Sequence, residues 1–206
     1  MTRLADALTQ IGGLLDELKA DWALVGGLAV SVRAVPRFTR DIDLVVAVSD
    51  DGDAERVVYA LSNLGYTIRT VIEQDATNRL ATARLSPPGE SQEGVLVDLL
   101  FASSGIESEI AAGADRVEVF TGVEIPVATQ AHLLAMKVLS NDALRRPQDS
   151  ADIRALLQVC SDDDLAAALR ALELITSRGF HRERDLRRDL DQVIAAGSGA
   201  GGGTSS

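Results

Sequence analysis

The 206-residue sequence has a single cysteine and few aromatic residues, and both shortages limit what the protein can be. With Cys160 alone no internal disulfide can form, so a reducing compartment such as the cytoplasm is the expected location. Cys160 ends an apolar helical stretch, which is typical of a buried structural thiol and disfavours a catalytic one. Aromatic residues make up 3% of the chain, so the core has to be built from Leu, Val, Ile and Ala.

Long apolar runs are also missing from the sequence. No stretch approaches the roughly 20 consecutive apolar residues that a membrane-spanning helix needs. The first residues, MTRLADALTQIGGLL, lack the continuous apolar segment of a signal peptide. We therefore expect a cytoplasmic protein without a membrane partner.

Basic residues are in the minority as well. Twenty Lys and Arg residues against 31 Asp and Glu residues give a formal net charge of −11. Indiscriminate nucleic-acid binding is disfavoured, because it depends on neutralising phosphates with basic side chains. A local basic groove stays compatible with this charge, and so does an acidic pocket for a cationic substrate. The only histidines, His132 and His181, do not lie near a Ser or Cys nucleophile pattern, which disfavours triad chemistry.

Hydrophobic periodicity predicts an α/β half followed by a helical half. Helices are expected first over residues 4–19, 28–35, 53–64 and 105–112. Strands are expected over residues 22–25, 41–48, 66–72, 79–85, 94–101, 117–120 and 123–127. We therefore predict an α+β protein with a mixed sheet in residues 1–128, a helical subdomain in residues 129–196 and a flexible Gly/Ser-rich tail in residues 197–206.

Carboxylates inside apolar strands are the most informative feature of the sequence. Asp41 and Asp43 open the strand DIDLVVAV and point to the same face, with their α-carbons roughly 6.5–7 Å apart. Asp98 lies inside a second apolar strand, VLVDLLF. Oxygen ligands of this kind suit Mg²⁺ or Mn²⁺, and three of them could hold ions that activate a hydroxyl and stabilise a leaving pyrophosphate. The alternative is that these acids end their strands and meet only solvent.

A double glycine precedes the acids. Gly26 and Gly27 lie between a short strand and a helix, where glycine lets a phosphate approach the backbone and the first amides of the helix attract anions. A tight strand-to-helix turn without a ligand is the alternative. Five arginines could add a basic rim for phosphates: Arg33, Arg37, Arg40, Arg79 and Arg84.

The helical half contains a lysine on an apolar helix face. Lys137 in LLAMKVL either extends to solvent or serves an anionic ligand. Asp149 and Asp152 are three residues apart and share a helix face, so an antiparallel helix pair could bring Lys137 to Asp149. An ordinary helix start is the alternative, because Pro147 suits a first turn and Asp149 suits the positive end of a helix. The basic run HRERDLRRDL is typical of a solvated helix face, although its arginines could meet RNA.

Taken together, these residues resemble a known family. Gly-Gly, a short helix and R-x-T-x-D-I-D-L on a strand are similar to the nucleotidyltransferase superfamily with a polymerase-β-like core. The resemblance is closest to the AbiEii-type toxins, the nucleotidyltransferase half of type IV toxin–antitoxin systems. VDLLFA, HLLAMKVLS and RRPQDSADIRALL match the family's third strand acid, its lysine and its D-x-x-D segment, so the resemblance extends over residues 23–157.

The resemblance implies a polymerase-β-like core, a mixed sheet flanked by helices, followed by a C-terminal helical bundle. It also implies roles for individual residues. Gly26 and Gly27 would hold the triphosphate, and Asp41 and Asp43 would bind Mg²⁺ or Mn²⁺. Asp98 would complete the metal site or act as the base. Lys137 would contact a phosphate of the nucleotide, and Asp149 would orient that lysine or the substrate. Thr39 and Arg40 lie next to the metal-binding acids, where they could contact phosphate. The superfamily's usual Gly-Ser is Gly-Gly here, so no serine hydroxyl is available for phosphate.

The resemblance leads to a first hypothesis about function. The protein would move a nucleoside monophosphate from an NTP to tRNA or a protein, as the toxin partner of an antitoxin encoded nearby. A second hypothesis keeps the chemistry but makes the acceptor a small molecule such as an aminoglycoside. A third is a catalytically silent nucleotide-binding domain, which three unpaired strand carboxylates would argue against. The sequence does not indicate the preferred nucleotide, the oligomeric state or a role for Asp152 beyond helix stability.

Overall fold

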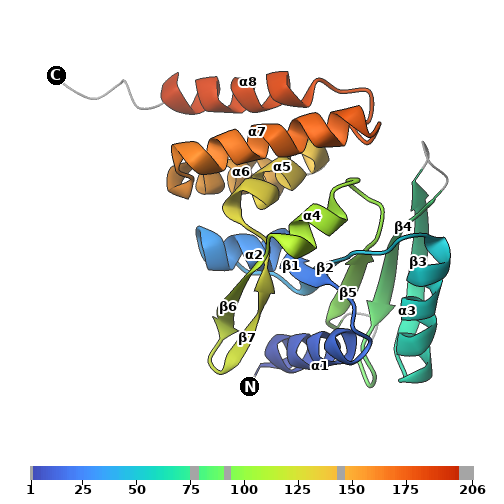
Figure 1. The fold of residues 1–206 in the computed structure, drawn as a ribbon. Coiled ribbons are helices and arrows are strands. Elements are labelled where there is room, and N and C mark those ends of the chain that lie inside the picture. Colours follow the sequence, from blue (N-terminus) through green and yellow to red (C-terminus); the bar gives the residue numbers. More distant parts are fainter. Residues whose placement is uncertain (1, 75–78, 91–93, 143–146, 200–206) are drawn as a thin grey trace.

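The computed structural model describes residues 2–74, 79–90, 94–142 and 147–199 of the chain. It contains a mixed seven-stranded sheet flanked by helices and a C-terminal helical region (Figure 1). The expected α+β class and the order of strands and helices along the chain are therefore confirmed. Within the ranges given above, no helix combines the length and the apolar character needed to cross a membrane.

Most elements begin and end within a few residues of the expected positions. The strands are β1 (Trp22–Val25), β2 (Asp41–Val46), β3 (Thr67–Gln74), β4 (Arg79–Ser86), β5 (Leu96–Leu100), β6 (Asp115–Phe120) and β7 (Val123–Val127). The helices are α1 (Arg3–Glu17), α2 (Gly26–Arg33), α3 (Asp51–Asn63), α4 (Glu107–Ala112), α5 (Gln130–Ser140), α6 (Pro147–Val159), α7 (Asp162–Ser177) and α8 (Leu186–Gly199). Helix α2 begins at Gly26 rather than at Leu28, so the double glycine forms its first turn.

Strand pairing brings the acidic residues together. The strand order is β3-β4-β5-β2-β1-β7-β6, which places β2 in the middle of the sheet between β5 and β1. Strand β5 runs parallel to β2 and sets Asp98 directly beside Asp43. Strand β1 runs antiparallel to β2, and its last residue, Val25, lies beside Asp43 on the other side. The Gly26–Gly27 turn therefore begins where the acids of β2 and β5 meet.

An aliphatic core holds these strands in place, as the composition requires. Every residue of β1 is buried, and Leu24, Ile42 and Leu99 are completely so. Asp41 and Asp43 are partly buried and alternate with the buried Ile42 and Leu44, so the apolar residues of β2 fix the direction in which the two acids point.

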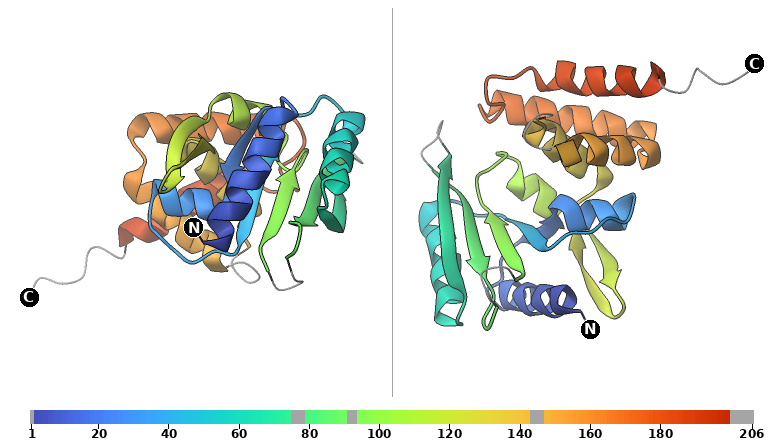
Figure 2. Two further views of the ribbon diagram at one scale, coloured as in Figure 1. Left: turned by 90° about the horizontal axis from the view of Figure 1, so that it is seen from below. Right: turned by 180° about the vertical axis from the view of Figure 1, so that it is seen from behind.

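The helical half packs on the sheet-bearing half through α2. Helices α5 to α8 lie together above the sheet, and α2 lies between them and the strands when the molecule is seen from behind (Figures 1 and 2). Helix α2 contacts β1 and β2 as well as α5 and α6. The change from strands to helices falls between Val127 and Gln130, and a division at residues 128 and 129 stays a proposal. Of the expected tail, residues 197–199 end α8, and residues 200–206 lie outside the described residues.

Candidate active site

Gly26 lies directly against the carboxylate of Asp43. Its φ is +66°, a left-handed conformation that residues other than glycine rarely adopt. A β-carbon added there would lie 1.9 Å from Oδ2 of Asp43. The backbone N–H of Gly27 donates a hydrogen bond to the same carboxylate. Glycine is therefore required at position 26 by the backbone conformation and by the lack of room for a β-carbon. The turn positions the carboxylate of Asp43.

Gly27 makes room for a different side chain. A β-carbon at Gly27 would lie 2.3 Å from Nη2 of Arg37, whose guanidinium covers the start of α2. Nη2 of Arg37 also donates to Oδ2 of Asp152 at 3.0 Å. In this structure the second glycine therefore accommodates an arginine of the loop between α2 and β2, and that arginine connects the turn to helix α6.

Lys137 is held by two buried carboxylates. Its Nζ lies 2.7 Å from Oδ1 of Asp149 and 2.9 Å from Oδ2 of Asp152, and its side chain is 13% exposed. Ser140 donates to the other oxygen of Asp149 at 2.9 Å. The lysine does not extend into solvent, and the contact between Lys137 and Asp149 that the helix pair allowed is present.

Asp152 belongs to a buried network of ion pairs, which the sequence did not indicate. Its side chain is 2% exposed and pairs with both Arg37 and Lys137. Burial alone would raise its pKa, but hydrogen bonds from Lys137, Gln148 and Arg37, together with the lysine charge, hold the pKa below its usual value. Asp152 therefore stays ionised and joins the loop before β2 to helices α5 and α6.

Asp98 is paired with an arginine. Arg84 of β4, its cross-strand neighbour, donates from Nε to Oδ1 at 2.7 Å and from Nη2 to Oδ2 at 2.6 Å. The side chain of Asp98 is 10% exposed and that of Arg84 is 43% exposed. The expectation of three unpaired strand carboxylates is therefore wrong for Asp98, because strand register brings a guanidinium to it.

The carboxylates repel one another across the strands. Burial, and after it the charge of Asp98, raises the pKa of Asp43 to about 6; Asp41 also raises this pKa, whereas Lys137 and the Gly27 N–H lower it. The hydrogen bond to Asp98 raises the pKa of Arg84 above its usual value. A cluster of like charges with one partly protonated member is the electrostatic setting that a bound cation relieves.

A divalent cation fits Asp41 and Asp43. Both provide oxygen donors on one face of β2, and burial together with the neighbouring carboxylates raises the pKa of Asp43. Among the residues that the structure describes, no group of three or more His, Cys, Asp or Glu side chains is arranged to hold a metal ion. In this structure both oxygens of Asp98 already accept hydrogen bonds from Arg84.

The remaining candidates lie at the edge of the site or away from it. Thr39 donates to the carbonyl oxygen of Asp41 at 3.4 Å, and Arg40 is exposed, with its guanidinium 5.5 Å from the ring centre of Phe38. Arg33 binds Asp115 and the carbonyl oxygens of residues 127 and 128, and Arg79 binds Asp51. Of the five arginines proposed as a rim, only Arg37 and Arg84 contact the acidic residues of the site.

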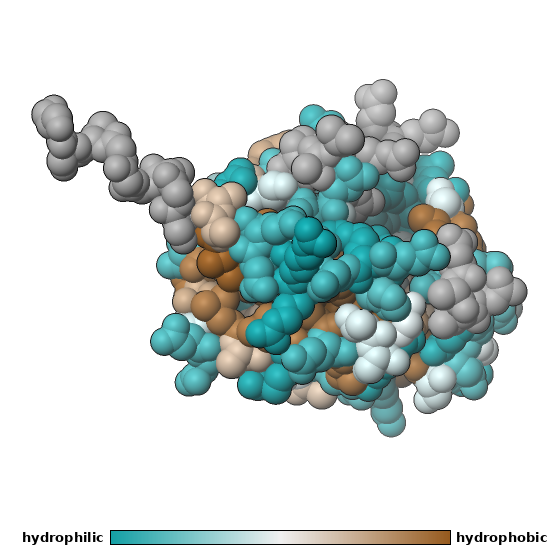
Figure 3. All heavy atoms as spheres, turned by 90° about the horizontal axis from the view of Figure 1, so that it is seen from above, coloured by the Kyte–Doolittle hydropathy of each residue, from teal (hydrophilic) through white to brown (hydrophobic). Residues whose placement is uncertain are grey.

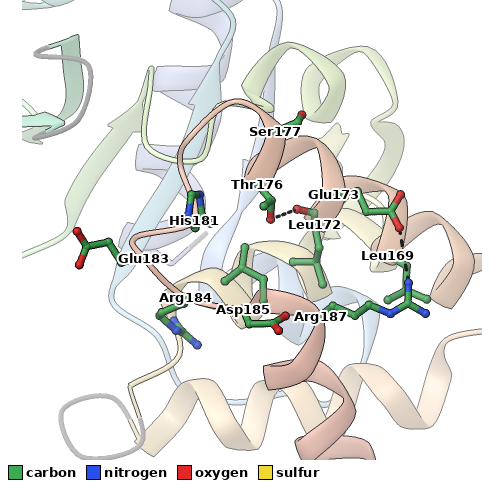
Figure 4. A pocket seen from close by; sticks show the side chains of 11 residues that line it. Leu169, Leu172, Glu173, Thr176, Ser177, His181, Glu183, Arg184, Asp185 and Arg187 are labelled. Carbon is green, nitrogen blue, oxygen red and sulfur yellow. Dashed lines mark hydrogen bonds and ion pairs between the residues drawn. The ribbon is translucent and has the colours of Figure 1, made fainter.

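The acids do not lie in the cavity between α7 and the segment leading into α8. That cavity has a volume of about 660 Å³ and is lined by leucines and by charged residues of both signs (Figure 4). Two of its arginines already have acidic partners, Arg184 with Asp189 and Arg187 with Glu173. The surface seen from above, over the helical half, is mainly hydrophilic (Figure 3). The basic run of residues 181–190 is thus balanced by carboxylates, as its sequence pattern indicated.

Comparisons with known proteins identify a family and a shared fold. A family model described as "Nucleotidyl transferase AbiEii toxin, Type IV TA system" matches residues 13–197. No curated protein sequence matches the chain.

Three solved structures share the fold at low identity. An antigenic nucleotidyltransferase-like protein from Paracoccidioides brasiliensis is 18% identical, with 91% of this chain and 92% of that chain covered and a TM-score of 0.52. The lincomycin-bound lincosamide antibiotic adenylyltransferase LnuA is 17% identical, with coverages of 78% and 99% and a TM-score of 0.50. ANT(2")-Ia in complex with adenylyl-2"-tobramycin is 16% identical, with coverages of 95% and 99% and a TM-score of 0.50.

Replacing Gly26 by alanine should destabilise the protein strongly. The added β-carbon meets the Asp43 carboxylate in a backbone conformation that alanine resists, so the free energy of unfolding should fall by about 2 kcal/mol or more. Urea unfolding measures the loss. Gly13→Ala is the matched control: no atom lies within 4 Å of its added β-carbon, and helix propensity predicts a gain of about 0.5–1 kcal/mol. Equal effects of the two substitutions would contradict the packing argument.

Replacing Asp43 by asparagine should stabilise the metal-free protein at pH 7.5. The folded carboxyl has a pKa above its unfolded value, so folding binds a proton between about pH 4 and 6, and wild-type stability falls as the pH rises through that window. We expect the variant to exceed wild type by about 1–2 kcal/mol at pH 7.5 and by much less at pH 4.5. Urea unfolding in EDTA at both pH values measures the difference.

The control for this experiment is Asp21→Asn, which changes an exposed carboxylate. It should leave stability within about 0.5 kcal/mol at both pH values. Magnesium ions should stabilise wild type but not Asp43→Asn. A variant less stable than wild type at pH 7.5 would mean that the charge of Asp43 is already compensated in the free protein.

Replacing Asp152 by alanine should cost about 3–5 kcal/mol, because it leaves Lys137 and Arg37 without a shared buried carboxylate. Chemical unfolding at neutral pH measures the loss. Glu173→Ala, which removes an acid from the exposed pair with Arg187, should cost less than about 1 kcal/mol. Similar costs for both would show that the buried network contributes no more than a surface pair.

Proposed function

Because the chain belongs to the AbiEii family of nucleotidyltransferases, we propose that it transfers a nucleoside monophosphate from an NTP to an acceptor hydroxyl with the help of Mg²⁺. One observation carries this proposal: Asp41, Asp43 and Asp98 lie side by side where the Gly26–Gly27 turn begins helix α2. Phosphoryl transfer requires mainly positioning and charge stabilisation, and this arrangement provides both.

We assign the triphosphate to the start of α2 and to Lys137. Helix α2 begins beside Asp43, to which the Gly27 amide donates, and a helix N-terminus favours phosphate. Lys137 lies near enough to Asp43 to lower its pKa, and its two buried carboxylates fix the position of its ammonium group. Asp149 and Asp152 would thus orient the lysine, and Thr39 and Arg40 would lie at the outer edge of the nucleotide.

The acids of β2 and β5 would bind the metal ion and activate the acceptor hydroxyl. Asp41 and Asp43 would hold Mg²⁺ or Mn²⁺, which supplies a positive charge for the phosphates and favours ionisation of the acceptor hydroxyl. Asp98 would complete this metal site or accept the proton of that hydroxyl, and in either role it would compete with its two hydrogen bonds from Arg84. Asp43 would change from a partly protonated to a fully ionised carboxylate in the loaded enzyme.

We propose that the acceptor is a tRNA or a protein side chain and that the activity is that of a toxin. The description of the family as the toxin of a type IV system supports the toxin role and implies an antitoxin partner. The net charge of −11 is compatible with tRNA only if the contact is local.

A small-molecule acceptor is the second candidate. LnuA and ANT(2")-Ia, which share the fold, are named for antibiotic substrates or were solved with an adenylylated antibiotic. At 16% and 17% identity these likenesses concern the fold alone. A silent nucleotide-binding domain is a weaker candidate, because Asp41 and Asp43 keep a clustered charge that binding alone does not need.

Asp41→Ala and Asp43→Ala should each lower nucleotide transfer by about 100-fold or more, since each removes a metal-binding carboxylate. The assay incubates the protein with Mg²⁺, each of the four labelled NTPs and either total tRNA or a cell protein extract. Asp163→Ala, an exposed acid in the first turn of α7, is the matched control and should retain wild-type activity. Undiminished transfer by both active-site variants would overturn the proposal.

Expression in cells separates the candidate acceptors. A toxin should arrest growth in the wild-type form and not as Asp41→Ala, whereas a small-molecule enzyme should raise resistance to an antibiotic without arrest. Calorimetry that detects neither NTP nor Mg²⁺ binding would favour the silent domain.

A further inference from the structure

The pairing of Asp98 with Arg84 sets the third acid apart from the other two. Both oxygens of Asp98 accept hydrogen bonds from one guanidinium, at 2.7 and 2.6 Å, and this is the strongest geometry that an arginine and a carboxylate adopt. Among the residues that the structure describes, Asp41 and Asp43 form no ion pair of this kind. Asp98 is therefore paired within the protein, while its neighbour on β2 is not.

Arg84 can move without disturbing the core. It lies on β4, and the strand order places β4 on the opposite side of β2 from β1 and the double glycine. Its side chain is 43% exposed, against 10% for Asp98. Release of the guanidinium would expose an arginine that is already partly solvated, and the backbone of β4 would keep its pairing with β5.

A divalent cation and Arg84 compete for the same charge. A cation held by Asp41 and Asp43 lies beside Asp98, because Asp43 and Asp98 are direct neighbours in the parallel strand pair. Two positive groups at one carboxylate repel each other. A cation at Asp98 therefore weakens the bond to Arg84, and Arg84, the more exposed partner of that bond, can be released to solvent.

We propose that Arg84 is an exchangeable partner of Asp98: it positions this carboxylate in the free protein and is displaced when a divalent cation binds to the acids of β2 and β5. Arg84 is thus a positioning residue that lowers the affinity of the free protein for the cation. This inference rests on the metal site of the proposed function and extends it to a residue of β4.

The test measures cation binding in the absence of nucleotide. Mn²⁺ is titrated by calorimetry into metal-free wild type, Arg84→Gln and Arg84→Lys. Arg84→Gln should bind Mn²⁺ about five- to tenfold more tightly than wild type, because removing the competitor frees Asp98. Arg84→Lys should lie between the two, since a lysine keeps the charge but cannot bind both carboxylate oxygens at once.

Two controls separate loss of the partner from loss of charge. Arg79→Gln removes the same charge from the same strand, where Arg79 pairs with Asp51, and should change Mn²⁺ affinity less than about twofold. In an Asp98→Asn background, Arg84→Gln should no longer tighten Mn²⁺ binding, because the group it would release is absent. Thermal unfolding in EDTA shows that each variant is folded.

The results of these titrations distinguish failure of this inference from failure of the proposed function. Unchanged affinity in Arg84→Gln and Arg84→Lys, or equal tightening with and without Asp98, overturns the inference. If nucleotide transfer still depends on Asp41 in that case, the proposed function stands and only the exchange at Asp98 falls. Absence of Mn²⁺ binding by every variant overturns this inference together with the metal dependence of the proposed function.

Discussion

The structure depends on a contact that leaves no room for a side chain. The carboxylate of Asp43 lies against the backbone of Gly26, in the middle of the sheet and at the start of helix α2. This contact fixes the first turn of α2, because a left-handed φ and a missing β-carbon are both required there. It also concentrates negative charge at the end of β1, and the surrounding ion pairs are arranged around that charge.

Each positive group near the acids has a defined partner. Lys137 is shared by Asp149 and Asp152, Arg84 is bound to Asp98, and Arg37 joins Asp152 to the start of α2. Within the described part of the chain, Asp41 and Asp43 have no arginine or lysine that donates two hydrogen bonds to them. The protein thus orients its basic side chains through other carboxylates, and Asp41 and Asp43 are the acids to which we assign the cation.

Local patterns predicted the strands, the face shared by Asp41 and Asp43, and the proximity of Lys137 and Asp149. Each of these predictions uses the periodicity within one strand or helix, or the proximity of two helices that follow each other in the chain. The pair of Arg84 and Asp98 depends on strand register, which the alternation of RLATARL does not reveal. The sequence leaves open whether Asp152 has a role beyond helix stability, because RRPQD is typical of a helix start and the partner Arg37 lies 115 residues away. Arg37 is the first residue of the R-x-T-x-D segment, and its place just before the acids of β2 was the feature of the sequence that could have indicated its role.

The bond between Arg37 and Asp152 has a consequence for the modularity of the chain. It crosses from the loop before β2 to helix α6, and the same helix also supplies the partner of Lys137. Removal of the helical half would take away the carboxylate that binds Arg37, and removal of the α/β half would leave Asp152 without Arg37. A recombination event that exchanged one half would therefore have to supply the matching charge in the other.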